Sequence, residues 1–345
     1  MTDSVFRRWI PFLLVAGLLA GWVVISRRSA GSLVVYCTHD LVYAEPVLEE
    51  FTRRTGIKVT VVGDTEATKS LGLVERLLRE GDQTPCDLFW NNEVLGTIRL
   101  QQKELLATYT GSATQRIPSQ FRDPAQQWFG FGGRMRVWIV NPTAFGSRDT
   151  PVTGEEIDAR MAGHDLSRVA IARPLYGTTF TQYAMLWKLH GPGLTQLEHL
   201  EMVEHGCQFV AGNAMVRDVV AGGSCDFGMT DTDDVFAARD SGFKVEMLPI
   251  RIDGKTLCIP NTVCILKSSD RPAEATQLLE YLLSEGVELE LARTARQIPL
   301  GSIADDKLPA EVRPLARWAQ ESWNVAEAAD IAPACLEWLK SEYAR

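Results

Sequence analysis

The chain has 345 residues, of which 46% are hydrophobic and 23% are charged, and these values are typical of a folded protein rather than a disordered or fibrous one. Its length exceeds that of one ordinary domain, so we expect two lobes with separate cores. The formal net charge of −9 argues against nucleic acid or an anionic membrane surface as a partner, because both attract clusters of Lys and Arg.

The N-terminus carries a hydrophobic segment. Two arginines precede an uncharged run over 9–25, and Arg27 and Arg28 follow it. A run of this length lies at the lower edge of a membrane span and above that of a cleaved signal core. We therefore expect residues 1–30 to be a signal anchor or a signal peptide. Either one places the rest of the chain in the periplasm or on another extracytoplasmic face, anchored by 9–25 if the segment is retained.

From Leu33 onward, a short β-branched run, a polar loop and an amphipathic helical stretch alternate. This alternation is the pattern of an α/β domain. In the first part of the chain it predicts strands over 33–36, 58–62 and 87–90, with helices over about 44–54 and 70–78 and from residue 93. A strand over 136–140 ends at Asn141 and Pro142, and we expect the chain to cross there into a second lobe.

The pattern resumes after this crossing. It predicts strands over 169–172, 225–229 and 245–248, and helices that end near residues 189, 220 and 239. A hairpin around Pro260 is expected to return the chain to the first lobe, and mostly helix follows from Pro272. We therefore assign 31–135 plus about 245–285 to lobe 1, and 136–244 plus about 286–345 to lobe 2.

Seven cysteines are scattered along the chain without the C-x-x-C pairs that mark zinc or thioredoxin-like sites. In an oxidising compartment, Cys258 and Cys264 would face one another across the expected hairpin and could form a disulfide. The alternative is that these cysteines are buried and unpaired.

The polar loops between strands and helices are the expected ligand-binding region. In open α/β sheets, ligands bind beyond the carboxyl ends of strands, where helix N-termini present free N–H groups. The candidates in these loops are His39, Glu66, Trp90, Asn91, Tyr176, Thr178, Thr179, Asn213, Asp231 and Asp233. The same loops also hold Tyr43, Asn92, Glu93 and Asp234. The polar candidates would equally serve as helix caps, and the two aromatic ones as packing at a lobe edge.

Sequence signatures of enzymes are missing. The chain contains no HExxH, P-loop, GxGxxG or GxSxG motif. Cys37, two residues before His39, is the one candidate nucleophile. The sequence therefore favours a binding protein over an enzyme.

Residues 34–59, which read VVYCTHDLVYAEPVLEEFTRRTGIKV, resemble the opening of the periplasmic iron(III)-binding proteins of ABC importers, within the wider extracellular solute-binding family. Later segments are similar to that family in order and spacing, namely EATKS at 66–70, CDLFWNNE at 86–93, GRMRV at 133–137 and IPNT at 259–262. The resemblance implies an α/β, two-lobed periplasmic binding protein fold, type II-like, with hinge strands. It also implies a monomeric substrate-binding component that hands its small ligand to an ABC permease in the inner membrane.

The resemblance also implies a ferric iron site, with no required cofactor. His39 matches an early-loop histidine of the family, and Glu66 lies near a family carboxylate ligand. Many members carry adjacent tyrosines where this chain has acidic residues after Met229. The metal ligands expected on this basis are His39, Glu66, Asp231 and Asp233, since carboxylates also bind hard cations. Arg134 and Thr178 are expected to place a synergistic anion.

The missing tyrosine pair leaves other functions open. A phosphorylated or other small organic anion is the main alternative ligand, with Trp90 and Tyr176 as walls of its site. A ligand-sensing domain would differ only in its partner. An extracytoplasmic enzyme is the least favoured alternative.

Overall fold

The computed structural model describes residues 31–64, 71–147 and 149–344. The expected signal or anchor segment, 1–30, lies outside these residues, as does the candidate ligand Glu66. None of the helices within the described ranges is long and apolar enough to cross a membrane.

One continuous sheet of nine strands runs through the described part of the chain. The strand order is β2-β1-β3-β9-β4-β7-β5-β6, and β8 pairs with β4. The strands are β1 (Ser32–Cys37), β2 (Lys58–Gly63), β3 (Leu88–Asn91), β4 (Phe129–Val140), β5 (Val169–Ala172), β6 (Gln208–Val210), β7 (Phe227–Asp231), β8 (Glu246–Pro249) and β9 (Cys258–Ile265). β1 is parallel to β2 and β3, and β5 is parallel to β6 and β7, whereas β4 and β9 pair antiparallel to their neighbours.

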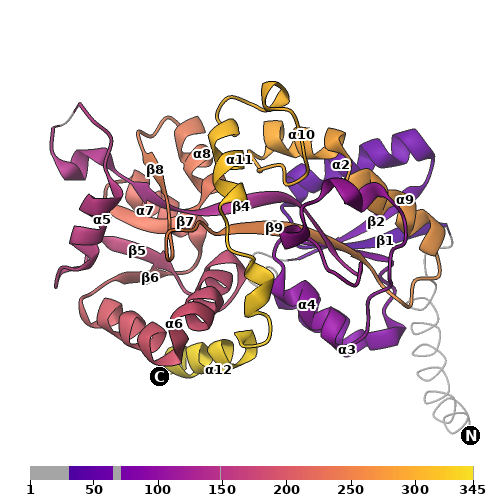
Figure 1. Cartoon of the computed structure of the whole chain (residues 1–345), viewed down its shortest axis with the longest axis horizontal. Helices are drawn as coiled ribbons and strands as arrows, with labels where there is room; N and C mark the ends of the chain where they lie inside the picture. Colours follow the sequence, from indigo (N-terminus) through magenta and orange to yellow (C-terminus); the bar gives the residue numbers. More distant parts are fainter. Residues whose placement is uncertain (1–30, 65–70, 148, 345) are drawn as a thin grey trace, which may run out of the picture.

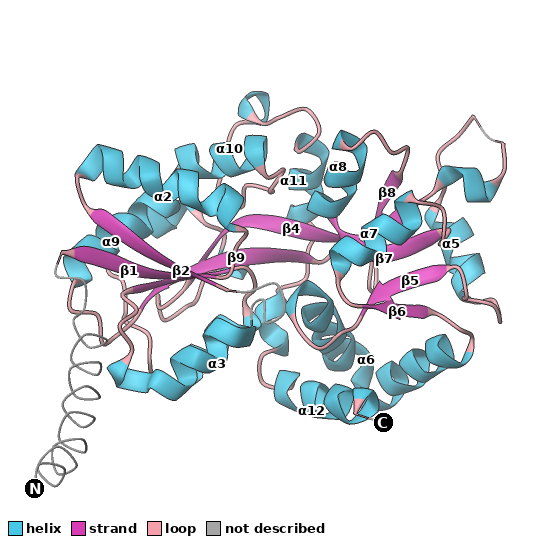
Figure 2. Ribbon diagram, turned by 180° about the vertical axis from the view of Figure 1, so that it is seen from behind, coloured by secondary structure: helices cyan, strands magenta, loops and turns pink. Residues whose placement is uncertain are grey.

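Helices cover both faces of this sheet (Figures 1 and 2). They are α2 (Leu41–Thr55), α3 (Leu71–Glu80), α4 (Leu95–Gln102), α5 (Gly154–Met161), α6 (Gly177–Glu204), α7 (Asn213–Ala221), α8 (Thr232–Asp240), α9 (Pro272–Leu282), α10 (Glu285–Thr294), α11 (Arg313–Gln320) and α12 (Ala332–Tyr343). Short 3-10 turns are η1 (Gly81–Gln83), η2 (Ala113–Arg116), η3 (Ser119–Phe121), η4 (Pro142–Phe145), η5 (Asp305–Lys307) and η6 (Val325–Ala328). The helices expected near 44–54, 70–78, 213–220 and 232–239 are thus confirmed.

Two lobes share the long strand β4. Its residues 129–135 pair with β9 in the half of the sheet that contains β1, β2 and β3. Its residues 136–140 pair with β7, and residues 137–140 also pair with β8, in the other half. Figure 1 shows β4 and β9 running between the two halves, each with its own helices. The expected two-lobed α/β architecture, with strands that join the lobes, is confirmed.

One hydrophobic cluster lies within the first lobe, whereas another joins Tyr36 and Phe89 of the first lobe to Phe180 of α6 in the second. In the first lobe, α2 and α9 pack on one face of the sheet with Leu33 and Val35. Val287 and Leu291 of α10 belong to the same cluster. We therefore propose that lobe 1 continues through α10, so that the C-terminal part of lobe 2 starts after Thr294 rather than near 286.

The expected hairpin around Pro260 is wrong, because β9 is one unbroken strand. Strand β4 is also longer than predicted, since its glycine-rich first half looks like a loop in the sequence. The two errors have one cause. Gly132, at φ 51°, lies at an irregularity of β4 between Phe131 and Gly133, and Pro260 pairs with Gly133 there. A bulge tolerates a proline, which has no N–H to donate.

The unbroken strand β9 also rules out a disulfide between Cys258 and Cys264. Cys258 and Cys264 lie at opposite ends of the same strand, about 20 Å apart at 3.3 Å per residue. A disulfide needs its two Cα atoms within about 7 Å, so these residues do not bridge. All seven cysteines are buried free thiols.

Candidate functional site

A cleft of about 1010 Å³ lies between the two lobes. Asp40, Asn92 and Arg134 line it from the first lobe. The wall from the second lobe consists mainly of the first turns of α6 and α7 and the acidic residues at the start of α8. The cleft therefore lies beyond the carboxyl ends of β1, β3, β5 and β7, which is the position that the sequence predicts for the ligand.

Three helices of the second lobe begin at the cleft. The backbone is extended at Tyr176, Gly212 and Asp231, and α6, α7 and α8 start at the next residue in each case. The first N–H groups of a helix have no partner within it and carry the positive end of its dipole. This wall therefore attracts anions through its backbone and cations through its carboxylates.

Asp231 is the centre of a buried hydrogen-bond network. Its Oδ1 accepts from Arg136 Nη1 at 2.8 Å, and its Oδ2 accepts from Thr178 Oγ1 at 2.6 Å and Asn213 Nδ2 at 2.9 Å. Arg136 is fully buried and also donates from Nε to Gln182 Oε1 at 2.8 Å. The register of β4 against β7 places Arg136 directly opposite Asp231. The network fixes the first turns of α6 and α7 to the end of β7.

Asp233 and Asp234 form the acidic wall of the cleft. Ligand oxygens of Asp231, Asp233 and Asp234 all lie within 4.8 Å of one another. Burial, followed by the neighbouring Asp234 charge, raises the pKa of Asp233 to about 8. Burial and the Asp231 charge raise the pKa of Asp234 to about 6. Burial and the neighbouring negative charges therefore disfavour the ionised form of these carboxyl groups, and a bound cation would stabilise that form.

The hydrogen bonds of the two carboxylates differ. Asp234 Oδ2 accepts from Thr230 Oγ1 at 2.7 Å, and Asp234 Oδ1 lies 3.8 Å from Arg217 Nη1. Asp233 Oδ1 is buried and has no hydrogen-bond partner among the described residues. Asp233 is thus the carboxylate of the cluster that has an oxygen unsatisfied by the described residues.

Arg134 reaches the cleft from β4. Its side chain is only 7% exposed, and its Nη2 donates to the backbone oxygen of Asn92. Its Nε has no partner within the described part of the protein. A buried guanidinium N–H without a partner is costly, and an oxyanion in the cleft would satisfy it.

The structure brings most of the predicted site residues together. Those that line the cleft are Arg134, Tyr176, Thr178, Thr179, Asn213, Asp231 and Asp233. The other described candidates, His39, Trp90 and Asn91, are buried in the first lobe and are not among the residues that line it.

His39 is held in an aromatic stack. Its ring lies 5.4 Å from Trp90 and 6.1 Å from Tyr43, centroid to centroid, and its Nε2 lies 3.1 Å from Gln297 Nε2. Asn91 is held in place by hydrogen bonds. Its Oδ1 accepts from Thr38 Oγ1 at 2.8 Å, and its Nδ2 donates to Thr97 Oγ1 at 3.1 Å. Rearrangement of these contacts would precede any role of either residue as a ligand.

Sequence reasoning missed Arg136 and left Asp234 out of the candidate set. Asp234 is adjacent to a chosen residue, and only the structure shows that its oxygens join the cluster. For Arg136 a signal existed: an arginine inside the apolar strand RVWIV has to be buried, and a buried arginine needs a carboxylate partner.

The candidate nucleophile Cys37 is unsuited to catalysis. Burial raises the pKa of its thiol to about 12, so the reactive thiolate is scarce at neutral pH. The Sγ donates to the backbone oxygen of His39 at 3.7 Å, rather than meeting its imidazole. The structure therefore does not support Cys37 as a catalytic nucleophile.

A protein-family model matches most of the chain. Residues 33–288 match the model described as bacterial extracellular solute-binding protein, which is well over half of the chain. The chain belongs to this family. A curated relative of this solute-binding protein is the major ferric iron-binding protein of Neisseria meningitidis, which is 23% identical over 82% of this chain and 85% of its own length.

Solved structures show the same fold. Iron-bound HitA from Pseudomonas aeruginosa has a TM-score of 0.76 at 20% identity, over 90% of this chain and 99% of its own. A Trichodesmium protein, described as in complex with iron and citrate ligands, has a TM-score of 0.72 at 19% identity, over 90% and 99% of the two chains. The likeness confirms the two-lobed periplasmic binding protein architecture.

Proposed function

We propose that this solute-binding protein is the extracytoplasmic substrate-binding component of an ABC import system and that it captures ferric iron in the inter-lobe cleft. The observation that carries the proposal is the cluster of Asp231, Asp233 and Asp234 on the cleft wall. Oxygen-rich sites suit hard cations, and Fe(III) is one of them. The cluster occupies the segment in which many ferric binders of the family carry their tyrosine pair.

The contacts of each carboxylate support different roles within the cluster. Both oxygens of Asp231 are already engaged by Arg136, Thr178 and Asn213. We therefore assign Asp231 to holding the wall in place, and Asp233 and Asp234 to binding the metal. His39 and Glu66 are not needed for this ligand set.

A co-bound oxyanion completes the proposed site. Two carboxylates leave most coordination positions of a ferric ion unfilled, and Arg134 and the starts of α6 and α7 lie in the same cleft. An anion held by Arg134 Nε would bridge the metal and the first lobe. Citrate fits this role, and the Trichodesmium relative is described with iron and citrate.

A second candidate ligand is a phosphorylated small molecule. Arg134, Arg173 and Arg217 line the cleft together with three helix N-termini, and this set would suffice to bind a phosphate group without metal.

Melting curves of the full chain separate the two candidates. The ligands to compare are iron(III) citrate, citrate alone, inorganic phosphate and glycerol phosphate, each with and without a chelator. A ligand at about 100 times its Kd adds about 2.7 kcal/mol of stability, which raises the melting temperature visibly. A shift with iron(III) citrate alone that the chelator removes supports ferric binding. A shift with phosphate compounds and none with iron rejects it.

A further inference from the structure

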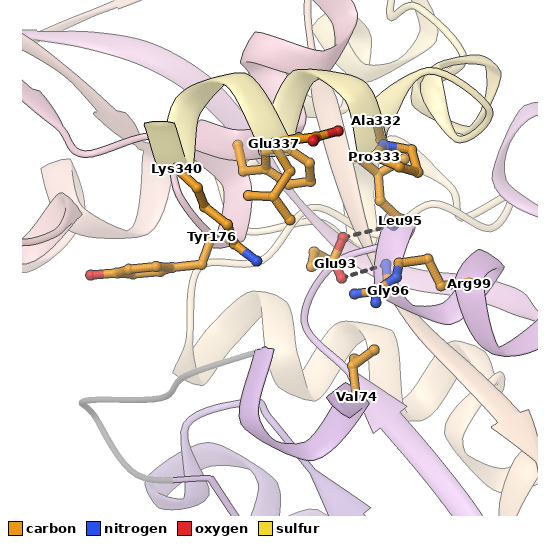
Figure 3. A pocket seen from close by; sticks show the side chains of 13 residues that line it. Val74, Glu93, Leu95, Gly96, Arg99, Tyr176, Ala332, Pro333, Glu337 and Lys340 are labelled. Atoms are coloured by element: carbon orange, nitrogen blue, oxygen red, sulfur yellow. Dashed lines mark hydrogen bonds between the residues drawn. The ribbon is translucent and has the colours of Figure 1, made fainter. Parts of the chain in front are cut away.

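A second cavity, of about 250 Å³, lies beside the cleft (Figure 3). Its wall combines residues of α3 and α4 from the first lobe, the start of α6 from the second, and α12. The apolar residues that line it are Val74, Leu95, Phe180, Ala332, Pro333 and Leu336. Protein interiors hold few voids larger than a water molecule, and an apolar cavity of about 150 Å³ already admits benzene. This cavity therefore has room for a substituted ring or a short aliphatic chain.

The buried acid at this cavity is already satisfied. Glu93 accepts from the backbone N–H groups of Leu95 and Gly96, both at 2.7 Å, and from Asn91 Nδ2 at 3.2 Å. Figure 3 shows its carboxylate turned toward the first turn of α4. Glu93 thus closes one end of the cavity and has little capacity left for a ligand.

The available charge at the mouth is positive. Lys340 extends from α12 toward Glu93, whereas the carboxylate of Glu337 stays beside α12 (Figure 3). Lys340 forms no ion pair with any described residue. Arg99, which also lines the cavity, forms an ion pair with Glu75 over 2.9 Å. An apolar pocket with a free ammonium group at its mouth suits an amphipathic anion.

We propose that this cavity is a second ligand site, which takes a small carboxylic acid with an apolar body. The apolar body would lie against Leu95, Phe180 and Leu336, and the carboxylate would meet Lys340 and Arg99. None of these groups belongs to the carboxylate cluster, so the proposal does not rest on iron binding. Because Tyr176 and Gly177 line both cavities, and the second one contacts both lobes, its occupancy is linked to lobe closure.

Calorimetric titration of the metal-free full chain with benzoate, hexanoate and the uncharged benzyl alcohol tests the site. We expect saturable binding of both acids and weaker binding of the alcohol. Ala332→Phe fills the cavity and should abolish binding, and Lys340→Met should weaken it about tenfold. Lys103→Met, an exposed change at the end of α4, is the control and should change nothing.

Two results would overturn the proposal. One is the absence of saturable binding of either acid to the unaltered chain. The other is acid binding that persists unchanged in both Ala332→Phe and Lys340→Met. A repeat of the benzoate titration with saturating iron(III) citrate tests the linkage, and we expect a changed benzoate affinity. Equal affinities with and without iron, once the melting curves have shown that iron(III) citrate binds, would refute the linkage.

Discussion

Arg136 Nη1 donates to Asp231 Oδ1 over 2.8 Å, and both side chains are almost wholly buried. This ion pair joins β4, the strand that both lobes share, to the last residue of β7, which immediately precedes α8. It also neutralises one member of the acidic cluster, so two carboxylates remain for a cation. The position and the charge of the proposed iron site thus both depend on this pair.

Loss of one partner of this pair should be costly. Asp231→Ala leaves the buried Arg136 charge without its counter-ion, and we expect a loss of about 3 to 5 kcal/mol in the free energy of unfolding. Urea denaturation measures it. The control is Glu321→Ala, which breaks the exposed Arg251–Glu321 pair and should cost less than about 1 kcal/mol. Similar losses in the two variants would contradict the role given to Asp231.

Arg134 should make iron binding depend on an anion. Arg134→Met removes the N–H group that has no partner among the described residues, so iron should bind about tenfold more weakly in citrate buffer. The affinity of the variant should also respond less to citrate concentration than that of the unaltered chain. Arg251→Met, an exposed change, serves as the control. An undiminished citrate dependence in Arg134→Met would exclude Arg134 as the anion-binding residue.

The apoprotein should lose stability as the pH rises. Asp233 and Asp234 have folded-state pKa values of about 8 and about 6, above the ordinary value of 3.8. The folded state therefore favours their protonated forms. Their stabilising effect is complete below about pH 4 and is lost as the pH rises through about 6 and then 8. Urea unfolding at about pH 5 and about pH 8.5 should show this fall, and Asp233→Asn should reduce it. A fall of the same size in Asp233→Asn would contradict the assignment.

Metal capture should release protons. At about pH 7 Asp233 is mostly protonated in the empty cleft, and a ligating carboxylate has to be ionised. Calorimetry of iron(III) citrate binding in two buffers of different ionisation enthalpy counts the protons released. Release should decrease in Asp233→Asn relative to the unaltered chain. Equal release in the two proteins would mean that Asp233 does not bind the metal.

Local patterns in the sequence were enough to predict the α/β class, the two lobes and the strand-end position of the cleft. The alternation of strands and helices is a local signal, and Thr178, Asn213, Asp231 and Asp233 lie at the end of a strand or in the first turn of the helix that follows one. The remaining features of the site depend on long-range packing. The aromatic stack around His39 and the pairing of Arg136 with Asp231 join segments far apart in the chain, so no local pattern identifies which residues meet. Likewise, Pro260 looks like a turn until the bulge in β4 is known.

The most direct test of the account is the equilibrium affinity of the full chain for iron(III), supplied as citrate, measured beside the variant that carries both Asp233→Asn and Asp234→Asn. Asp305→Asn, an exposed change on η5, is the matched control. We predict chelator-sensitive binding in the unaltered chain and the control, and a loss of about 100-fold or more in the double variant, since both metal-binding carboxylates are gone. Equal affinity in all three proteins would contradict the assignment of this acidic wall as the iron site.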